Sequence, residues 1–403
     1  MSNSVTKVTR RSWFDRLGAS IKGVLIGAVL FLVSFVVLWW NEGRAVKTAA
    51  GLSQLRVEVV SADPARIDPA NEGRAVHLTG NATTAETLTD AEFGIAVPAI
   101  RLRRQAEMYQ WHEESRTEER RKTGGGSEQV TTYDYKRVWS DRAIPSDRFQ
   151  RAAEHANPGP LRVESRDATA GDVTLGAFRL SPALVGQMTN FEPLTISESE
   201  AAIREQFDDR VVLAGNTVYL PFSPDGPLPE PGSPKIGDLK VEFSTVQPAV
   251  VSLIARQVQG TFEPWRAVSG TAFERLALGT ISADEMIGRM ESENTMLTWA
   301  LRLGGFAMMA FGIGMVLAPV AVVADVLPIL GDLTRMGTGL FAMVVAAALS
   351  LATIAVAWLA YRPVLAIGLL VAGAALVVGL WTLARRRKTQ LAAAAAPPPV
   401  PEG

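Results

Sequence analysis

The long apolar runs of this chain are placed very unevenly: one lies near the N-terminus and three crowd the C-terminus, with a mostly polar stretch between them. Each run is close to the roughly 20 residues that a helix needs to cross about 30 Å of hydrocarbon. Tryptophan and tyrosine rings cluster at the ends of the runs, where they favour the headgroup layer. The sequence therefore predicts an integral membrane protein with one large domain outside the bilayer. The runs are Gly23–Trp40, Leu303–Val323, Gly337–Leu359 and Val364–Leu383.

Buried helices and a cleaved signal peptide fit these runs less well than membrane spans do. Buried helices of a soluble protein rarely stay apolar on all sides over this length. The first run is also longer than the apolar part of a secretory signal peptide, which has about 7 to 15 residues. Its end, Trp39-Trp40-Asn41-Glu42, offers no small-residue cleavage site. The first run is therefore predicted to be a signal anchor.

Basic residues flank the predicted membrane region at both ends. Lys7, Arg10, Arg11, Arg16 and Lys22 precede the first run, and Arg385, Arg386, Arg387 and Lys388 follow the last. The positive-inside rule then places both termini in the cytoplasm, and four crossings return the chain to its starting side. The expected segments are a basic cytoplasmic leader (1–22), membrane helices (23–40, 301–323, 337–359 and 364–384), an extracytoplasmic domain (41–300), a cytoplasmic interfacial loop (324–336), a short outer turn (360–363) and a cytoplasmic tail (385–403).

The outer domain is expected to be α+β and rich in antiparallel strands. Several stretches combine β-branched or aromatic residues with partial alternation of apolar and polar residues, which is typical of strands. The predicted strands are Leu55–Val60, Ala75–Thr79, Arg101–Trp111, Val130–Trp139, Asp172–Phe178, Asn216–Phe222, Asp238–Phe243 and Val250–Phe262. Glu113–Lys122 is dense in charge and leads to three glycines, so a long hairpin with a mobile, solvated tip is favoured over a binding loop.

Helix starts are fewer and carry hydroxyl caps. Ser181-Pro182 begins one helix, and Ser197-Glu198-Ser199-Glu200 has the pattern of a capping box that opens Ala201–Phe207. A third helix is expected to start at Ser282, to run toward Trp299 and to couple the outer domain rigidly to the second span. The proline-rich stretch Pro221–Pro234 predicts a surface loop. The fold class is thus a four-helix transmembrane bundle plus a large α+β extracytoplasmic domain.

The predicted membrane helices carry small residues rather than charges. Glycines in the first, second and fourth runs would let helix backbones approach closely, although glycine is also simply common in membrane helices. Asp325, Asp332, Arg335 and Arg362 all fall between runs or at their ends, so no ion pathway is indicated. The segment 324–336 is expected to lie along the cytoplasmic interface as a short amphipathic piece, and a re-entrant segment is the alternative.

Residue types that carry chemistry are scarce. Cysteine is absent and the three histidines, His77, His112 and His155, are widely spaced, so no catalytic, cofactor-binding or metal site is predicted. No nucleophile elbow or phosphate-binding glycine loop occurs. Removing the basic flanks from the net charge of −1 leaves an acidic outer domain, which argues against binding of nucleic acid. The protein is expected to be no enzyme and to need no cofactor.

Several uncommon strings occur in one order along the chain. Trp40-Asn41-Glu42-Gly43-Arg44-Ala45-Val46 leaves the first span, Glu107-Met108-Tyr109-Gln110-Trp111 and Ile254-Ala255-Arg256-Gln257 lie in predicted strands, and Tyr361-Arg362-Pro363 joins the last two spans. In these strings and their spacing the chain closely resembles the transmembrane protein 43 family, also called LUMA. The alanine- and arginine-rich composition suggests a bacterial member. The signature positions, expected to be structural, are Asn41, Glu42, Gly43, Arg44, Glu107, Tyr109, Trp111, Arg256, Tyr361, Arg362 and Pro363.

The resemblance implies a four-pass protein without enzymatic activity. Eukaryotic relatives reside in the endoplasmic reticulum and inner nuclear membrane, where they organise nuclear-envelope proteins; a bacterial member would share only the generic role of membrane scaffold. Two functions are therefore predicted. One is an organiser that binds membrane lipids and membrane proteins; further copies of the chain, in a homo-oligomer, are among the expected partners. The other is a lipid-binding or transport protein with a membrane-proximal pocket, and a membrane hydrolase ranks last.

Overall fold

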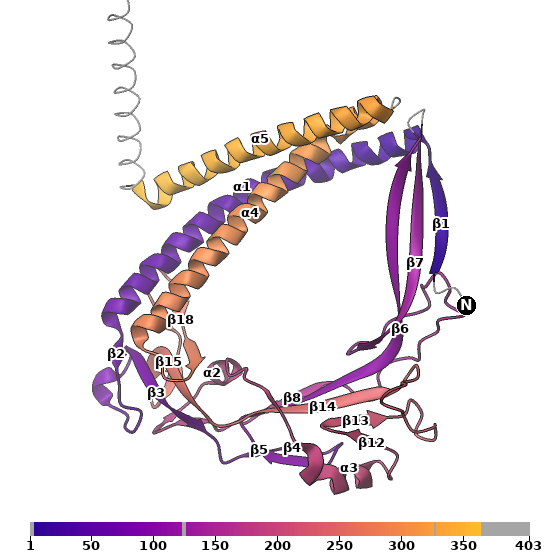
Figure 1. Cartoon of the computed structure of the whole chain (residues 1–403). Helices are drawn as coiled ribbons and strands as arrows, with labels where there is room; N and C mark the ends of the chain where they lie inside the picture. Colours follow the sequence, from indigo (N-terminus) through magenta and orange to yellow (C-terminus); the bar gives the residue numbers. More distant parts are fainter. Residues whose placement is uncertain (1–3, 123–125, 326–327, 364–403) are drawn as a thin grey trace, which may run out of the picture. The chain divides into compact units, whose positions relative to one another are not determined.

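The computed structural model describes residues 4–122, 126–325 and 328–363 (Figure 1). The chain divides into two compact units. The β-rich unit comprises residues 1–16, 50–293 and 326–328, and the helical unit comprises residues 17–49, 294–325 and 329–403. Two helices, α1 (Trp13–Glu58) and α4 (Ala283–Ala324), each contribute residues to both units.

The larger sheet of the β-rich unit is built around one long antiparallel hairpin. β6 (Arg101–Arg121) pairs with β7 (Ser127–Ser140) along its outer half and with β14 (Leu239–Val246) along its inner half. The order is β1-β7-β6-β14-β13-β12, with β8 on β6 and β11 on β14. The remaining strands of this sheet are β1 (Ser4–Arg11), β8 (Arg166–Thr169), β11 (Glu192–Pro193), β12 (Val212–Ala214) and β13 (Thr217–Leu220).

The second sheet is centred on β3 and β15, which pair from Ala75↔Arg256 to Ala82↔Ala249. Buried and exposed side chains do not alternate regularly along β15, because most of its side chains are buried. The order is β10-β9-β3-β15-β16, with β19 on β15 and β2 parallel to β3. The bounds are β2 (Val60–Ser61), β3 (Ala75–Thr83), β9 (Thr174–Leu175), β10 (Phe178–Arg179), β15 (Ala249–Val258), β16 (Thr261–Glu263) and β19 (Arg275–Leu278).

Short elements complete the β-rich unit. Two further hairpins are β4 (Thr87–Asp90) with β5 (Ile95–Pro98), and β17 (Trp265–Arg266) with β18 (Ala272–Phe273). The short helices are α2 (Pro182–Gly186), α3 (Glu200–Gln206), η1 (Pro69–Asn71) and η2 (Ile196–Ser199). Ser181 caps α2, since its hydroxyl accepts a hydrogen bond from the Leu184 amide at 3.2 Å.

The main core lies between these elements and is dense in fully buried apolar side chains. Phe93 is at its centre, with the rings of Phe207 and Phe243 at 4.9 and 5.2 Å. Arg104 enters this core from β6; its guanidinium lies 3.0 Å from the buried Asp90 carboxylate and stacks over Phe93. A buried charge of this kind is tolerated because it is paired. A second core packs Leu52 and Leu55 of α1 with α4 and with the β17–β18 hairpin.

The predicted long hairpin of the strands near Tyr109 and Tyr133 is confirmed, but its strands extend further than expected. The charged segment Glu113–Lys122 is not a loop tip: β6 continues as a strand to Arg121, and its register with β7 runs from Met108↔Ser140 to Arg121↔Ser127. Ser4–Arg11, within the basic leader, forms β1 and extends the sheet on the outer side of β7 (Figure 1), a strand that the sequence analysis did not predict. Both segments are polar, and β1 pairs with a strand more than 100 residues away, from Ser4↔Asp134 to Arg11↔Ser127, which local patterns do not reveal.

Other strand predictions are confirmed with three exceptions. Asp172–Phe178 was predicted to be one strand, but it contains a tight turn at Gly176, which takes positive φ and separates β9 from the start of β10. Leu55–Val60 was predicted to be a strand, but α1 continues to Glu58, because Leu52 and Leu55 share a helical face that is buried. Val250–Phe262 is a hairpin rather than one strand, since Gln259 and Gly260 take positive φ and separate β15 from β16. The predicted capping box at Ser197 is also wrong: Ser199 precedes α3 and makes no side-chain cap.

The helical unit contains the apolar parts of α1, α4 and α5 (Pro328–Tyr361). In the part of the chain that the structure describes, three helices are long and apolar enough to cross a membrane, namely α1, α4 and Asp332–Tyr361 of α5. The predicted fourth span, 364–384, lies outside the described residues, so a four-helix bundle is not shown. Pro328 begins α5, so most of the segment 324–336 belongs to this helix instead of forming a separate interfacial piece.

Glycines bring α1 and α4 into close contact, as the sequence predicted. A Cβ on Gly27 would lie 2.7 Å from the Gly312 carbonyl oxygen, and a Cβ on Gly312 would lie 2.7 Å from the Phe31 amide nitrogen. Nothing larger than hydrogen fits at either position without moving backbone. α4 runs unbroken from Ala283 to Ala324, which confirms the predicted continuous helix from the outer domain into the second span.

Candidate functional site

The signature residues of the first span meet side chains of α4 and α5 in a buried polar cluster of the helical unit. Glu42 is its centre, with its side chain 2% exposed. The guanidinium of Arg302 donates from Nε and Nη2 to the two carboxylate oxygens at 2.7 and 2.8 Å. The indole Nε1 of Trp358 donates to Oε2 at 2.8 Å. One carboxylate therefore ties α1 to both other helices.

The neighbouring turn of α1 adds three more links to α4. The Asn41 side-chain amide donates to the Thr298 carbonyl at 3.1 Å. Arg44 donates to the Asn294 side-chain oxygen and to the Thr298 hydroxyl, both at 2.9 Å. We call the group Asn41, Glu42, Arg44, Asn294, Thr298, Arg302 and Trp358 the Glu42 cluster. It is a network of charge-assisted hydrogen bonds, which fixes the register of the two helices.

Gly43 and Tyr361 fit together beside this cluster. A Cβ on Gly43 would lie 2.7 Å from the ring carbon Cζ of Tyr361, so any side chain at position 43 would require the tyrosine ring to move. The Trp39 ring is 5.8 Å from the same tyrosine. Arg362 stacks over Trp358 at 5.9 Å. The structure thus brings five of the signature positions, Asn41, Glu42, Gly43, Arg44 and Tyr361, into one place.

Sequence reasoning missed the residues that complete the cluster. Arg302, Asn294 and Thr298 were not singled out, and Trp358 was noted only as an interfacial ring. A signal was present in Arg302, which is a cation on the last turn before an apolar run. A charge at such a position needs a partner, and Glu42 at the end of another run is the natural candidate.

Other signature residues lie in the β-rich unit on one face of the larger sheet. Glu107, Tyr109 and Trp111 alternate along β6 with the buried Met108 and Gln110. They share the face with residues of β7, β13 and β14, as the register pairs Tyr109↔Trp139 and Glu107↔Lys240. We call this surface the Tyr109 face; it consists of Glu107, Tyr109, Trp111, Arg137, Trp139, Tyr219 and Lys240.

Rings and cations alternate across the Tyr109 face. The Trp139 ring lies 5.1 Å from Tyr109 and 6.2 Å from Tyr219. Arg137 stacks over Tyr109 and Trp111 at 6.0 and 5.5 Å. Each of these side chains is at least partly exposed. Aromatic rings and arginines of this kind are enriched where proteins bind one another.

Lys240 is held on this face by Glu107, with Nζ 2.6 Å from the carboxylate. Burial, the largest single influence, lowers the pKa of Lys240, but the hydrogen bond to Glu107 and the negative charges of Glu107 and Glu242 together raise the pKa overall. The ammonium also lies 5.4 Å above the Trp139 ring. The lysine is thus charged at neutral pH and fixed in position.

At one side of the Tyr109 face a loop covers the hairpin. His155 stacks on Tyr135 at 3.8 Å and meets the edge of Trp111 at 4.6 Å. The Tyr135 hydroxyl donates to Glu113 at 2.6 Å. Burial, and then this hydrogen bond, raise the pKa of Tyr135 to about 12. The side chain of Asn157 also holds this loop against β6, because it accepts a hydrogen bond from the Trp111 amide at 2.7 Å and donates one to the Trp111 carbonyl at 2.8 Å.

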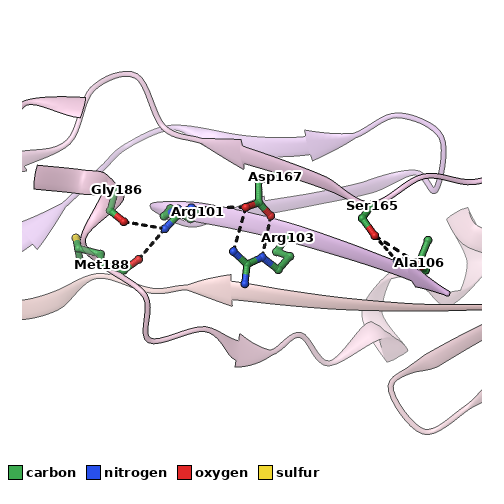
Figure 2. A network of polar contacts seen from close by, with 7 residues as sticks. All are labelled: Arg101, Arg103, Ala106, Ser165, Asp167, Gly186 and Met188. Atoms are coloured by element: carbon green, nitrogen blue, oxygen red, sulfur yellow. Dashed lines mark hydrogen bonds and ion pairs between the residues drawn. The ribbon is translucent and has the colours of Figure 1, made fainter. Parts of the chain in front are cut away.

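At the other end of β6, arginines fasten neighbouring segments to the sheet (Figure 2). Arg103 donates from Nε and Nη2 to the two Asp167 oxygens at 2.8 and 3.0 Å. Arg101 donates to the carbonyls of Gly186 and Met188 at 3.3 and 3.0 Å. The hydrogen bond from Arg103 lowers the pKa of Asp167. These contacts position segments within the fold.

The remaining signature residues stand apart. Arg256 on β15 forms an ion pair with Glu263 on β16, and Pro363 is the last residue that the structure describes. Among the described residues no group of three histidine, cysteine, aspartate or glutamate side chains is placed to hold a metal ion.

The helical unit also presents apolar grooves. One hollow of about 500 Å³ is lined by Phe35, Val36 and Trp39 of α1 and by Leu349, Ala352, Thr353 and Val356 of α5. A second, of about 490 Å³, lies between α4 and α5 around Phe306 and Met343. Both have almost wholly apolar linings, which suit acyl chains.

Comparison with known proteins gives one consistent result. The profile of a family described as Transmembrane protein 43 matches residues 108–363. Transmembrane protein 43 of Homo sapiens is 37% identical over 378 residues, covering 91% of this chain and 90% of the human protein. The Drosophila melanogaster homolog is 28% identical over 370 residues, covering 87% and 92% of the two chains. No solved structure matches the chain.

Proposed function

Because this chain belongs to the transmembrane protein 43 family, we propose that it is a non-enzymatic multi-pass membrane protein that organises other membrane proteins. The observation that carries the proposal is the Tyr109 face, where partly exposed aromatic rings and cations lie together on the larger sheet. Such a surface recognises a protein partner through a few large anchors. The apolar helices anchor the chain in the membrane, and the Glu42 cluster fixes the helices to one another.

Co-isolation in native lipid discs tests the organiser role. The full chain is purified with its surrounding lipid, and the proteins that come with it are identified by mass spectrometry. Partners are expected to be depleted by the double variant Arg137→Glu/Trp139→Ala, which changes the Tyr109 face. The matched control is Val268→Ser, a position 92% exposed elsewhere in the β-rich unit. Recovery of no specific partner, together with a turnover-dependent change in a lipid, would overturn the proposal.

The proposed topology has four crossings, with both termini in the cytoplasm and residues 50–293 of the β-rich unit on the outer side. It is supported by the basic flanks and by the apolar lengths of the helices. In a bacterium this membrane is the cytoplasmic membrane; in a eukaryote it would be the endoplasmic reticulum or inner nuclear membrane.

Single cysteines test the topology cleanly, because the chain has none of its own. A membrane-impermeant maleimide added to intact cells is expected to label Asp141→Cys in the β-rich unit and to leave Lys388→Cys unlabelled until the membrane is opened. Labelling of both positions from the same side contradicts four crossings.

Lipid binding is the second candidate, and the apolar grooves favour it. The groove at Trp39 and Thr353 lies between two helices and has room for an acyl chain. Thr353→Trp would fill it, whereas Leu351→Trp adds similar bulk at a residue 67% exposed on the same helix. Loss of one lipid species from the discs with the first variant alone supports lipid binding. An unchanged set of lipids with both variants removes this candidate.

A further inference from the structure

The outer edge of β7 accepts a whole strand. β1 pairs with it antiparallel over 8 residues, from Ser4↔Asp134 to Arg11↔Ser127. This pairing satisfies the backbone groups that an edge strand otherwise leaves open. Figure 1 shows β1 lying along the long hairpin for most of its length. The edge is therefore a strand-binding site whose register is known.

Charge favours a basic strand at this edge. The segment of β7 that β1 covers contains Glu128 and Asp134 and no cation, whereas β1 contains Lys7, Arg10 and Arg11. Nε of Arg10 lies 3.3 Å from the Glu128 carboxylate. Because the Arg10 side chain is 82% exposed, this ion pair is weak, and the backbone ladder supplies most of the attraction. Charge then selects among strands of similar shape.

The order of elements along the chain limits when β1 can fill this site. β1 precedes the apolar part of α1, and β7 follows it. When α1 crosses a bilayer once, the two strands end on opposite sides. The hairpin cannot follow the helix through hydrocarbon, since its outer half carries many charged residues and its edges would expose backbone groups.

We propose that in the membrane-inserted protein the β7 edge, Ser127–Asp134, binds an extended segment of another protein by strand addition. The segment contains β-branched residues and basic residues, as β1 does. This inference rests on the organiser function proposed above and identifies a partner chemistry for it. The site lies on the hairpin and uses none of the residues of the Tyr109 face.

Disulfide trapping tests the site at a defined register. Thr6 and Thr132 are opposite each other, at a separation that a cross-strand disulfide can bridge. The probe is a synthetic peptide of residues 4–11 with cysteine in place of Thr6. It is added under mild oxidation to full-length Thr132→Cys in lipid discs, from the side of the β-rich unit. The expected result is a mixed disulfide, seen as the added peptide mass. A peptide with cysteine in place of Thr9, which is opposite Gln129 and so about 10 Å away along the strand, should give little product.

Charge variants test the selectivity. Glu128→Lys in the Thr132→Cys background should lower the yield of mixed disulfide by roughly tenfold, because attraction for the basic peptide becomes repulsion. Glu118→Lys is the matched control: it makes the same charge change on β6, opposite Val130, and should leave the yield within about twofold. Equal yields in the two variants would overturn the charge argument.

Two results would overturn the proposal as a whole. An intramolecular disulfide in Thr6→Cys/Thr132→Cys, in discs, would mean that β1 keeps the edge in the membrane. A disulfide dimer of Thr132→Cys without peptide would mean that a second copy occupies it. Neither result affects the co-isolation experiment, which depends on the Tyr109 face, so failure of this inference and failure of the organiser function are distinguishable.

Discussion

Arg302 and Glu42 lie 260 residues apart in the chain and form two hydrogen bonds with each other inside the helical unit. The Arg302 and Glu42 side chains are 16% and 2% exposed, so little water can reach their charged groups if the contact between them is lost. A buried pair of this geometry holds a register more effectively than it adds net stability, because both charges have been desolvated. The loss of stability on mutation should therefore depend strongly on whether one residue of the pair is replaced or both are.

The first prediction concerns this pair. Glu42→Leu should cost about 3 kcal/mol of stability, because Arg302 is left charged and unpaired. Glu42→Leu/Arg302→Leu should cost less than the sum of the two single variants, measured as a thermal-unfolding cycle of the full chain in discs. As a control, Arg289→Ala breaks an exposed pair with Glu285 on α4 and should cost at most about 0.5 kcal/mol. Additive single costs would contradict the pairing.

The second prediction contrasts two glycines. Gly27→Ala should destabilise the helical unit by about 1 to 3 kcal/mol, because its methyl group would lie 2.7 Å from the Gly312 carbonyl oxygen. Gly314→Ala, on α4, meets none of the described residues within 4 Å. It should be neutral or stabilising by up to about 1 kcal/mol, since alanine favours helix. Thermal unfolding in discs measures both, and similar effects for the two variants would contradict the close crossing.

The sequence was most informative where local pattern and burial agree. Span length predicted the three described helices that are long and apolar enough to cross a membrane. Alternation predicted strands such as β3 and β14, which are half-buried or buried along most of their length. It was least informative where partners are distant. β1 is a polar segment that becomes a strand only because the β7 edge is available, and no local signal in Ser4–Arg11 reveals that edge.

The same limit applies to the candidate site. Asn41, Glu42 and Gly43 were recognised as a string, but their partners Arg302 and Trp358 come from other helices. A single sequence does not state which helices are neighbours. In contrast, the strand prediction for Leu55–Val60 failed through competition between local rules: β-branched residues favoured a strand, while burial of Leu52 and Leu55 on one face kept the helix.

The third prediction is an acid dependence from Asp167. Its pKa is lowered, mainly by the hydrogen bond from Arg103. A carboxyl whose pKa is lowered on folding contributes stability above its unfolded pKa, about 3.8, and the contribution is lost as the pH falls through the lowered value. Asp167→Asn should therefore lower the melting temperature at pH 5 to 7, and the difference should shrink as the pH falls below about 3.8. Asp141→Asn, at an exposed loop position, should change neither.

The last prediction is an alkaline dependence from Tyr135. Its pKa is raised to about 12 by burial and by its hydrogen bond to Glu113. The neutral phenol is thus the form that the fold favours, so the stability it contributes is complete below the unfolded pKa of about 10 and is lost as the pH rises toward 12. Tyr135→Phe removes this dependence, and its melting temperature should fall less steeply between pH 10 and 12 than that of the unchanged protein. Tyrosinate absorption in difference spectra of the two proteins locates the titration directly. A Tyr135 titration near pH 10 would contradict the burial of Tyr135 beneath His155 and its loop.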